Sequence, residues 1–414
     1  MSDQHLKLQK IFHMYGSNAA SEALLSRKQS LAGYTTNLII HPFNKEGLEK
    51  TSYPLFYVVT PEIFQKHTSV LLNSSKITKL VTQLPNYIIE PYFQKLIINE
   101  MQSTNEIEGV RSTRKELKEV LARLQEKNPK NKKFLGMVKT YKHIDSIAEF
   151  KELKDFRELY DDMISDEIDD HHKVDGDLFR KGEVSITSGS KVTHYGITPE
   201  SKIKEMLEQL IIFLEDTRHP ELFKYLIAHY YYEYIHPFYD GNGRTGRLIV
   251  GSYIARYLER YSAITFSYTV NKNKPLFYES LEEVSKPLNF GETTFYLENM
   301  LDLLITGQES LIEDLERNLY LKRHIDNQFK NLSHPDSSNK DRVLHYMLTF
   351  SVFFKEDFEV TRKELLEYFN LSEHKMKPVL ENMLDEEKIE IVKRNPLSYK
   401  VNKDFLNQVL DSTQ

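Results

Sequence analysis

The chain has 414 residues, of which 40% are hydrophobic and 28% charged, a composition typical of globular rather than disordered proteins. Its formal net charge of −6 gives the chain as a whole no attraction to nucleic acid or to an anionic membrane. The absence of cysteine excludes disulfides, thiolate metal sites and a cysteine nucleophile.

The N-terminal region, residues 1–110, shows no clear period before a helical pattern begins at Pro91. The polar start lacks the apolar core of a signal peptide, and no apolar run approaches the ~20 residues of a membrane span, so we expect a cytoplasmic protein without a membrane partner. The pattern from Pro91 predicts a helix, covering about 90–109, that ends at Gly109. Ser112 is expected to cap the next helix.

The middle of the chain, residues 111–330, is predicted to be helical with one β-hairpin. β-branched residues flank a small-residue turn over Glu183–Tyr195, which indicates the hairpin. Helices are expected over Leu222–Tyr234 and Arg244–Arg260, and the helical pattern continues to about Lys330.

The end of the chain is predicted to form a separate small domain, 341–414, after a polar linker, 331–340. Three helical segments precede two strands in Ile389–Val401, which is the pattern of a winged helix. Its 11 basic and 14 acidic side chains give a net charge of −3, which favours contact with protein over DNA, although DNA binding stays open.

The segment His236–Arg247 gathers the residues that a phosphate site needs. Gly241 and Gly243 can adopt positive φ and let backbone N–H groups converge on an anion at a helix N-terminus. Arg244 and Arg247 lie on one face of the first helical turn, where their guanidinium groups can share a polyphosphate.

Two side chains of the same segment add chemistry to this cradle. Asp240 stands beside it, where a carboxylate can hold a Mg²⁺ ion that bridges phosphate oxygens. His236 ends the preceding helix and can accept a proton near neutral pH. Together the set predicts nucleotidyl or phosphoryl transfer to a hydroxyl.

This segment, His-Pro-Phe-Tyr-Asp-Gly-Asn-Gly-Arg-Thr-Gly-Arg, resembles the signature of the Fic family, and the likeness extends over about residues 90–320. The resemblance implies a mainly α fold: a Fic-type helical bundle with a β-hairpin flap, followed here by the small winged-helix domain. It also implies a protein adenylyltransferase that moves AMP from ATP, with Mg²⁺, to a Ser, Thr or Tyr hydroxyl of a target protein. Because no basic residue interrupts Gly-Asn-Gly, AMP transfer is favoured over phosphate transfer.

The resemblance also assigns roles to the residues of the motif. His236 would be the catalytic base, and Asp240 would hold Mg²⁺. Phe238 would anchor the loop in the core. The phosphates would be bound by Gly241, Asn242, Gly243 and Arg244, and the γ-phosphate by Arg247.

Two more segments resemble parts of the family. The hairpin stands where the family has a flap that docks the target as an added strand, through Val184, Ser185, Ile186, Thr187, Val192 and Thr193. Tyr278 and Leu281 resemble the family's Tyr-x-x-Leu, whose aromatic residue lies near the adenine.

The segment Thr104–Gly109 matches the inhibitory motif of the family, a Ser or Thr followed by Glu and Gly or Asn. Thr104 and Glu108 lie one helical turn apart on the same face. A carboxylate presented to Arg247 can form a bidentate pair that removes the partner of the γ-phosphate. The resemblance therefore implies an autoinhibited enzyme.

Other functions stay open at this point. A related Fic enzyme could use another nucleotide donor or remove AMP from a modified target, and a nucleotide-sensing transcription regulator is a further alternative. Self-modification is expected to be possible, and a homodimer also, since relatives often dimerise.

Overall fold

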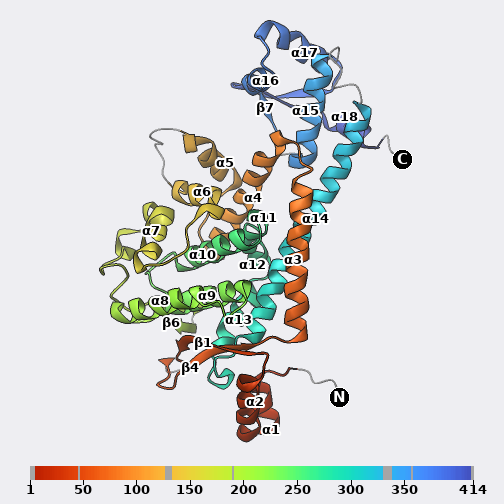
Figure 1. Cartoon of the computed structure of the whole chain (residues 1–414). Helices are drawn as coiled ribbons and strands as arrows, with labels where there is room; N and C mark the ends of the chain where they lie inside the picture. The colour runs from red at the N-terminus through yellow and green to blue at the C-terminus, as the bar shows by residue number, and fades with distance from the viewer. Residues whose placement is uncertain are drawn as a thin grey trace. The chain divides into compact units, whose positions relative to one another are not determined.

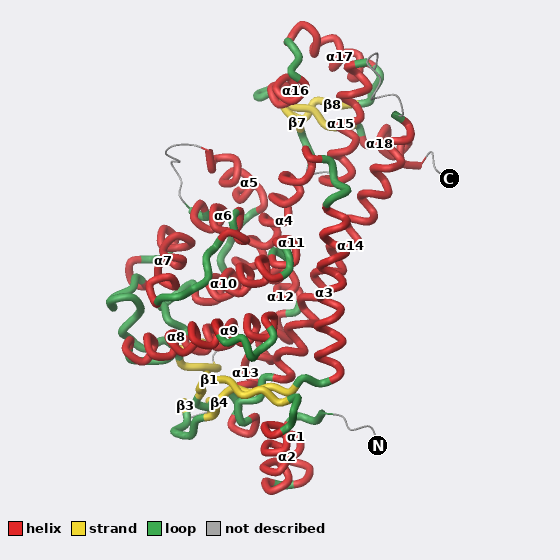
Figure 2. Tube along the Cα trace, viewed as in Figure 1, coloured by secondary structure: helices red, strands yellow, loops and turns green. Residues whose placement is uncertain are grey.

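A computed structural model of the chain describes residues 5–44, 47–125, 133–188, 191–329, 338–355 and 358–411. These residues fold mainly into α-helices with small antiparallel sheets, as the sequence predicts (Figures 1 and 2). By their contacts they divide into two units, Met1–Thr78 with Gln94–Ser310, and Lys79–Phe93 with Leu311–Gln414. Most of the predicted linker, 331–340, lies outside the described residues.

The first unit begins with two helices, small strand pairs and a long helix. The sequence of the first ninety residues showed no clear pattern that predicted them. In chain order its first elements are α1 (Leu8–Tyr15), α2 (Ser17–Gln29), β1 (Gly33–Ile40), β2 (Phe43–Asn44), β3 (Gly47–Leu48), β4 (Tyr53–Val58), α3 (Pro61–Val81), α4 (Asn86–Ile107), α5 (Arg114–Ala122), α6 (Leu135–Lys142) and α7 (Leu153–Ile164). The C-terminal end of α3, from Lys79, and the N-terminal end of α4, up to Phe93, belong to the second unit.

The helix that leads into the predicted inhibitory motif, α4, differs slightly from its prediction. It begins at Asn86 and continues through Pro91, and Gly109 with φ +72° follows its end. The predicted cap of the next helix is wrong by one residue: the side chain of Thr113 accepts the hydrogen bond from Glu116 N. Ser112 instead accepts a 3.1 Å hydrogen bond from Asn105 Nδ2.

The remaining elements of the first unit follow a hairpin. They are β5 (Ser185–Ser188), β6 (Lys191–Tyr195), α8 (Glu200–Glu215), α9 (Glu221–Ile235), α10 (Asn242–Tyr257), α11 (Arg260–Ala263), α12 (Phe266–Lys272), α13 (Lys274–Val284) and α14 (Thr294–Gln328). The predicted hairpin and the two predicted helices are present; α10 starts two residues earlier and ends three residues earlier than expected. The last part of α14 belongs to the second unit.

Two central helices form the core of the first unit. Helix α9 packs against both α8 and α10, which can be followed in Figure 1. Since neighbours cover it on several sides, α9 buries aromatic and apolar residues around most of its circumference, and every residue of α10 from Asn242 to Ala255 is buried. The loop between α9 and α10 is therefore held at both ends by the best-packed helices of the unit.

The second unit contains the predicted C-terminal elements. They are α15 (Asn339–Phe354), β7 (Val360–Thr361), α16 (Arg362–Phe369), α17 (Glu373–Asp385), β8 (Ile389–Arg394), β9 (Leu397–Val401) and α18 (Lys403–Asp411). The strands form one antiparallel sheet in the order β7-β9-β8. Three helices followed by a hairpin agree with the predicted pattern, whereas β7 and α18 were not predicted; the winged-helix assignment itself stays a prediction.

None of the helices in the described ranges combines the length and the hydrophobicity needed to cross a bilayer.

Candidate functional site

The segment between α9 and α10 forms a tight loop that leads into a helix N-terminus. His236 ends α9 in a left-handed conformation, with φ 54° and ψ 62°, and Gly241 precedes α10 with φ 78°. Glycine is favoured at 241, because this positive φ strains other residues and an added Cβ would also lie 2.0 Å from Ile164 Cδ1. No side chain among the described residues caps α10, which leaves the N–H groups of its first turn available to an anion.

The loop is anchored by one aromatic ring and one amide. Phe238 is fully buried, its ring stacked on Tyr160 with 3.7 Å between centroids. Asn242 Oδ1 accepts a 2.9 Å hydrogen bond from Phe238 N, and Asn242 Nδ2 donates a 2.8 Å hydrogen bond to Phe238 O. Both polar groups of the Asn242 side chain thus fix the shape of the loop, so any contact of Asn242 with phosphate in this conformation falls to its backbone N–H.

The backbone of His236 is held by a buried arginine that the sequence analysis did not single out. Arg180 Nε donates a 2.9 Å hydrogen bond to His236 O, and Arg180 Nη2 donates one of 2.9 Å to Ile197 O. A third hydrogen bond, from Nη1, reaches Gly182 O at 2.6 Å. One guanidinium therefore joins the His236–Arg247 loop to both ends of the hairpin. Arg180 lies outside any helical or strand pattern, so the sequence carried no signal for it.

The environment of His236 keeps its imidazole neutral. Burial, together with the nearby His194 and Arg180, lowers the pKa of His236 to about 3, although a hydrogen bond with the backbone of Glu233 acts in the opposite direction. At neutral pH the ring is therefore uncharged, which is the form that can accept a proton.

Asp240 is exposed at the mouth of the loop, where its Oδ1 accepts a 2.5 Å hydrogen bond from Gly241 N. Within the described ranges, no group of three or more His, Cys, Asp or Glu side chains could hold a metal ion. A lone carboxylate beside a phosphate cradle nevertheless suits Mg²⁺, which is commonly bound by one or two carboxylates together with substrate phosphates and water. The donor set therefore fits a Mg²⁺ ion that arrives with a nucleotide.

Arg244 is buried and already has a carboxylate partner. Its Nη1 donates a 3.0 Å hydrogen bond to Glu167 Oε2, and both side chains are almost inaccessible to solvent. Burial raises the pKa of Glu167, and the charge of Arg244 opposes that rise. Glu167 precedes the motif by about seventy residues, and nothing in its sequence surroundings indicated this contact.

Arg247 directly contacts the segment Thr104–Gly109, which is predicted to be inhibitory. Its Nη2 donates a 2.7 Å hydrogen bond to Glu108 Oε1, its Nε donates one of 2.9 Å to Thr104 Oγ1, and its Nη2 also reaches Thr104 O at 3.2 Å. The prediction of a bidentate pair is therefore wrong: one carboxylate oxygen of Glu108 accepts from the guanidinium, and Thr104 accepts the two other hydrogen bonds. Burial would lower the pKa of Arg247, but the charges of Glu108 and Glu233 outweigh it and the pKa is raised.

Helix α4, which leads into the predicted inhibitory segment, is bound to α12 and α13. The buried carboxylate of Glu100 accepts hydrogen bonds from Ser267 N at 2.9 Å and Tyr268 N at 3.1 Å. Lys274 Nζ donates a 2.7 Å hydrogen bond to Glu106 O. These contacts hold α4 so that its end faces Arg247.

The residue predicted to lie near an adenine, Tyr278, lies beside the segment Thr104–Gly109. Its hydroxyl is 3.5 Å from Ile107 O, and 40% of the residue is exposed. An exposed ring at this position is compatible with stacking on a base, and the role of Tyr278 stays a prediction.

The predicted flap residues lie on the β5–β6 hairpin or directly before it. Ser185 pairs with Tyr195 and Ile186 with His194, and the register shifts between Ile186 and Thr187. Two residues of the predicted turn, 189 and 190, lie outside the described residues. At the base of the hairpin, Gly196 N donates a 3.0 Å hydrogen bond to Val184 O.

Comparisons with known proteins agree with this geometry. Residues 150–254 match the model of the Fic/DOC family, and this range includes the hairpin and the His236–Arg247 loop. A solved structure described as a Fic family protein from Desulfovibrio desulfuricans G20 is similar over 84% of this chain and 98% of that chain, with 19% sequence identity and a TM-score of 0.52. That similarity shows the fold. Residues 150–254, which contain the site, are therefore similar to the Fic/DOC family.

Proposed function

We propose that the protein is an adenylyltransferase that moves AMP from ATP to a hydroxyl side chain of a target protein. The observation that carries the proposal is the loop between α9 and α10, in which a neutral His236 and the exposed carboxylate of Asp240 flank an uncapped helix N-terminus. Such a loop offers a base, a metal ligand and an anion cradle to one nucleotide.

Each part of the loop has its own role in the proposed reaction. The N–H groups at the start of α10, with Arg244, bind the α- and β-phosphates and fix the α-phosphorus for in-line attack. His236 accepts the proton of the target hydroxyl as its oxygen bonds to the α-phosphorus. The bond from that phosphorus to the bridging oxygen breaks, and pyrophosphate leaves. Mg²⁺ held by Asp240 would neutralise charge on the phosphate oxygens.

The inhibitory contact supports an enzyme that is switched off in this conformation. Arg247 is the guanidinium assigned to the γ-phosphate, and here it binds Glu108 and Thr104 instead. A nucleotide that enters this site lacks its γ-phosphate partner, so its α-phosphate is not aligned for attack. Removal of the Glu108 carboxylate should restore that partner.

In this proposal, parts of the molecule outside the His236–Arg247 loop bind the target segment and the adenine of ATP. The β5–β6 hairpin, with Val184, docks the target segment as an added strand, and Tyr278 lies against the adenine. In the C-terminal domain Lys393 of β8 is paired with Glu359, which reduces the positive charge available to DNA. We therefore propose that this domain contacts protein.

The test is incubation of three proteins with Mg²⁺ and ATP labelled at the α-phosphate, followed by intact-mass measurement. The proteins are the wild type, Glu108→Gly and Glu108→Gly/His236→Ala. We expect AMP on the single variant and none on the double variant. The absence of AMP on every variant, with ATP binding intact, would contradict adenylyl transfer from ATP. Parallel reactions with GTP, CTP and UTP, and with an AMP-modified sample, then separate another donor from AMP removal.

A further inference from the structure

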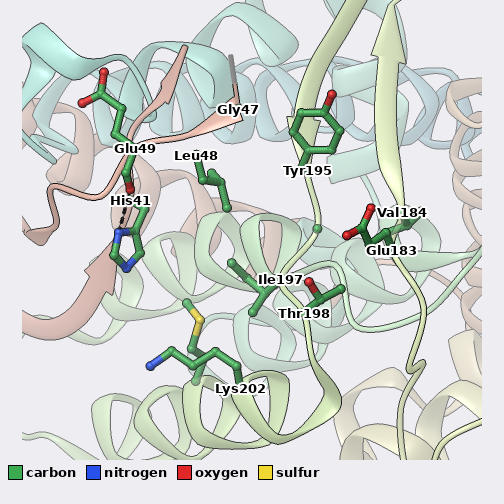
Figure 3. Close-up of a pocket in the computed structure, with 12 residues that line it drawn as sticks. His41, Gly47, Leu48, Glu49, Glu183, Val184, Tyr195, Ile197, Thr198 and Lys202 are labelled. Atoms are coloured by element: carbon green, nitrogen blue, oxygen red, sulfur yellow. Dashed lines mark hydrogen bonds between the residues drawn. The ribbon is translucent and has the colours of Figure 1, made fainter. Parts of the chain in front are cut away.

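A second concavity lies at the base of the flap, outside the nucleotide site. It has a volume of 470 Å³ and is lined by three parts of the first unit (Figure 3). Leu48 and Glu49 come from β3 and the residue after it, Glu183 and Tyr195 from the two ends of the hairpin, and Lys202 from the start of α8. Its volume is in the range of pockets that bind ligands or side chains.

This flap-base pocket is connected to the catalytic loop through Gly196, which lines it. A Cβ added to Gly196 would lie 3.2 Å from His236 Cβ and 2.6 Å from Val184 Cγ1, so the backbone there passes close to both. The next residue, Ile197, also lines the pocket, and its N–H donates a 3.0 Å hydrogen bond to Ile235 O. A group bound in the pocket would therefore be separated from His236 only by the backbone at Gly196 and Ile197.

The free edge of the hairpin indicates how a docked segment would reach the pocket. In the described part of the molecule, β5 pairs only with β6, and β6 lies beside the β2–β3 pair, where Phe43 contacts Tyr195 with 5.8 Å between ring centroids. The edge left for an added strand is therefore that of β5, which begins next to Val184 of the pocket. A segment that pairs with β5 runs toward the pocket.

The charges of the pocket are acidic on balance. Glu183 is exposed and has no hydrogen-bond or ion-pair partner in the described ranges, and Figure 3 shows its carboxylate pointing into the space between the drawn residues. Glu49 accepts a hydrogen bond from an uncharged donor, Asn44 Nδ2, at 3.0 Å. The cation of the pocket, Lys202, is bound to Glu205 at 2.6 Å. The remaining walls are largely apolar: Leu48, Val184, Ile197 and Met206.

We propose that this pocket selects target proteins that carry a lysine or arginine within a few residues of the acceptor hydroxyl. The aliphatic stem of such a side chain packs on the apolar walls while its charged end meets Glu183. The inference rests on the proposed function, because it takes the β5 edge as the docking site of the target. It adds a specificity determinant that lies partly in the N-terminal region of the chain.

The test uses full-length Glu108→Gly protein and eleven-residue fluorescent peptides with one Ser, Thr or Tyr. Each peptide carries Lys, Glu or Leu at one position within three residues of that hydroxyl. Binding is measured by fluorescence anisotropy and AMP transfer by mass. The same measurements follow on Glu183→Lys, and on Glu208→Lys as a control that changes the net charge equally at an exposed position of α8 outside the pocket.

We expect Lys peptides to bind and to be modified about two- to fivefold better than Glu peptides at low salt, the range that an exposed charge pair gives. The preference should reverse in Glu183→Lys and persist in Glu208→Lys. AMP transfer without a charge preference, or a preference that survives Glu183→Lys, overturns the pocket inference and leaves the proposed function standing. Charge-dependent binding lost in Glu183→Lys, without AMP transfer to any peptide, contradicts the proposed function and supports the pocket. Peptides that show no charge-dependent binding also overturn the inference.

Discussion

Arg247 and Glu108 meet across 139 residues of sequence, with 2.7 Å between Nη2 and Oε1, and they differ in exposure. The side chain of Arg247 is 2% exposed, whereas that of Glu108 is 28% exposed. The arginine is therefore fixed inside the fold, and the glutamate approaches it from the solvent side. Glu108 is the more exposed partner and follows the end of α4, so we expect Glu108, rather than Arg247, to move when the pair opens.

Thr104 should hold Arg247 in place independently of Glu108. Its hydroxyl is fully buried and accepts the hydrogen bond from Arg247 Nε. Thr104→Val keeps the shape of the side chain and removes the acceptor, leaving a buried donor unsatisfied. We expect the free energy of unfolding to fall by about 1–3 kcal/mol in urea denaturation. AMP transfer should rise less than in Glu108→Gly, because the carboxylate remains.

Thr104→Ser is the matched control for this substitution. It retains the hydroxyl and should behave like the wild type apart from the small loss of a methyl group. A Thr104→Val protein as stable as the Ser variant would show that the contact with Nε contributes nothing.

Phe238 should set the shape of the catalytic loop. Its ring stacks on Tyr160 and contacts Phe179, with 5.7 Å between the latter centroids. Phe238→Ala is expected to cost about 3–5 kcal/mol of unfolding free energy, as for other buried aromatic truncations. Phe238→Leu fills more of the space and should cost less. In the Glu108→Gly background, both variants should lose AMP transfer in the order of their stability loss; an active Phe238→Ala enzyme would contradict the anchoring role.

Much of the site follows from residues that are contiguous in sequence. The His236–Arg247 loop could be predicted because its glycines, charges and helix start lie within twelve positions, and the periodic helices on both sides identify it as a loop. The C-terminal helices could be predicted for a similar reason, since caps such as Thr361 mark their starts.

The rest of the site depends on contacts between distant positions. Glu167 reaches Arg244 and Arg180 reaches His236 only after folding, and neither residue belongs to a periodic segment. The pairing of the N-terminal strands β1 and β4 joins segments about twenty residues apart, so local pattern could not establish it. The single-oxygen contact of Glu108 likewise depends on where Thr104 places its hydroxyl.

Arg180 should act as a positioning residue for His236 and the flap. Its planar guanidinium group donates hydrogen bonds to three backbone carbonyls, and a lysine cannot reproduce that arrangement. In the Glu108→Gly background, Arg180→Lys should lower kcat for AMP transfer by about tenfold or more, which corresponds to roughly 1.4 kcal/mol of lost positioning. The affinity for ATP, measured by calorimetry, should stay unchanged, because Arg180 makes no contact with the N-terminal turn of α10. An equal loss of ATP affinity would contradict positioning and indicate general disruption.

Glu233 should make the stability of the protein fall as the pH rises. Burial raises its pKa from 4.5 to about 8, Arg247 opposes the shift, and Glu108 adds to it; His229 Nε2 also faces it at 3.6 Å. Between pH 4.5 and about 8 the folded protein therefore holds a proton that the unfolded chain has released. Stability from this group is complete below pH 4.5 and is lost as the pH rises through that interval.

Glu233→Gln should remove this part of the pH dependence, because a neutral amide has no proton to lose. At pH 8 the variant is expected to be more stable than the wild type by roughly 1–3 kcal/mol, since each unit of pKa shift corresponds to about 1.4 kcal/mol. At pH 5 the two should be nearly equal. Urea denaturation at both pH values tests this, with Glu208→Gln as the exposed control. The pKa of Glu100 is also raised by burial, to about 7, so some dependence of stability on pH should remain in the variant. Identical slopes in the wild type and Glu233→Gln would mean that Glu233 is ionised in the folded protein at neutral pH.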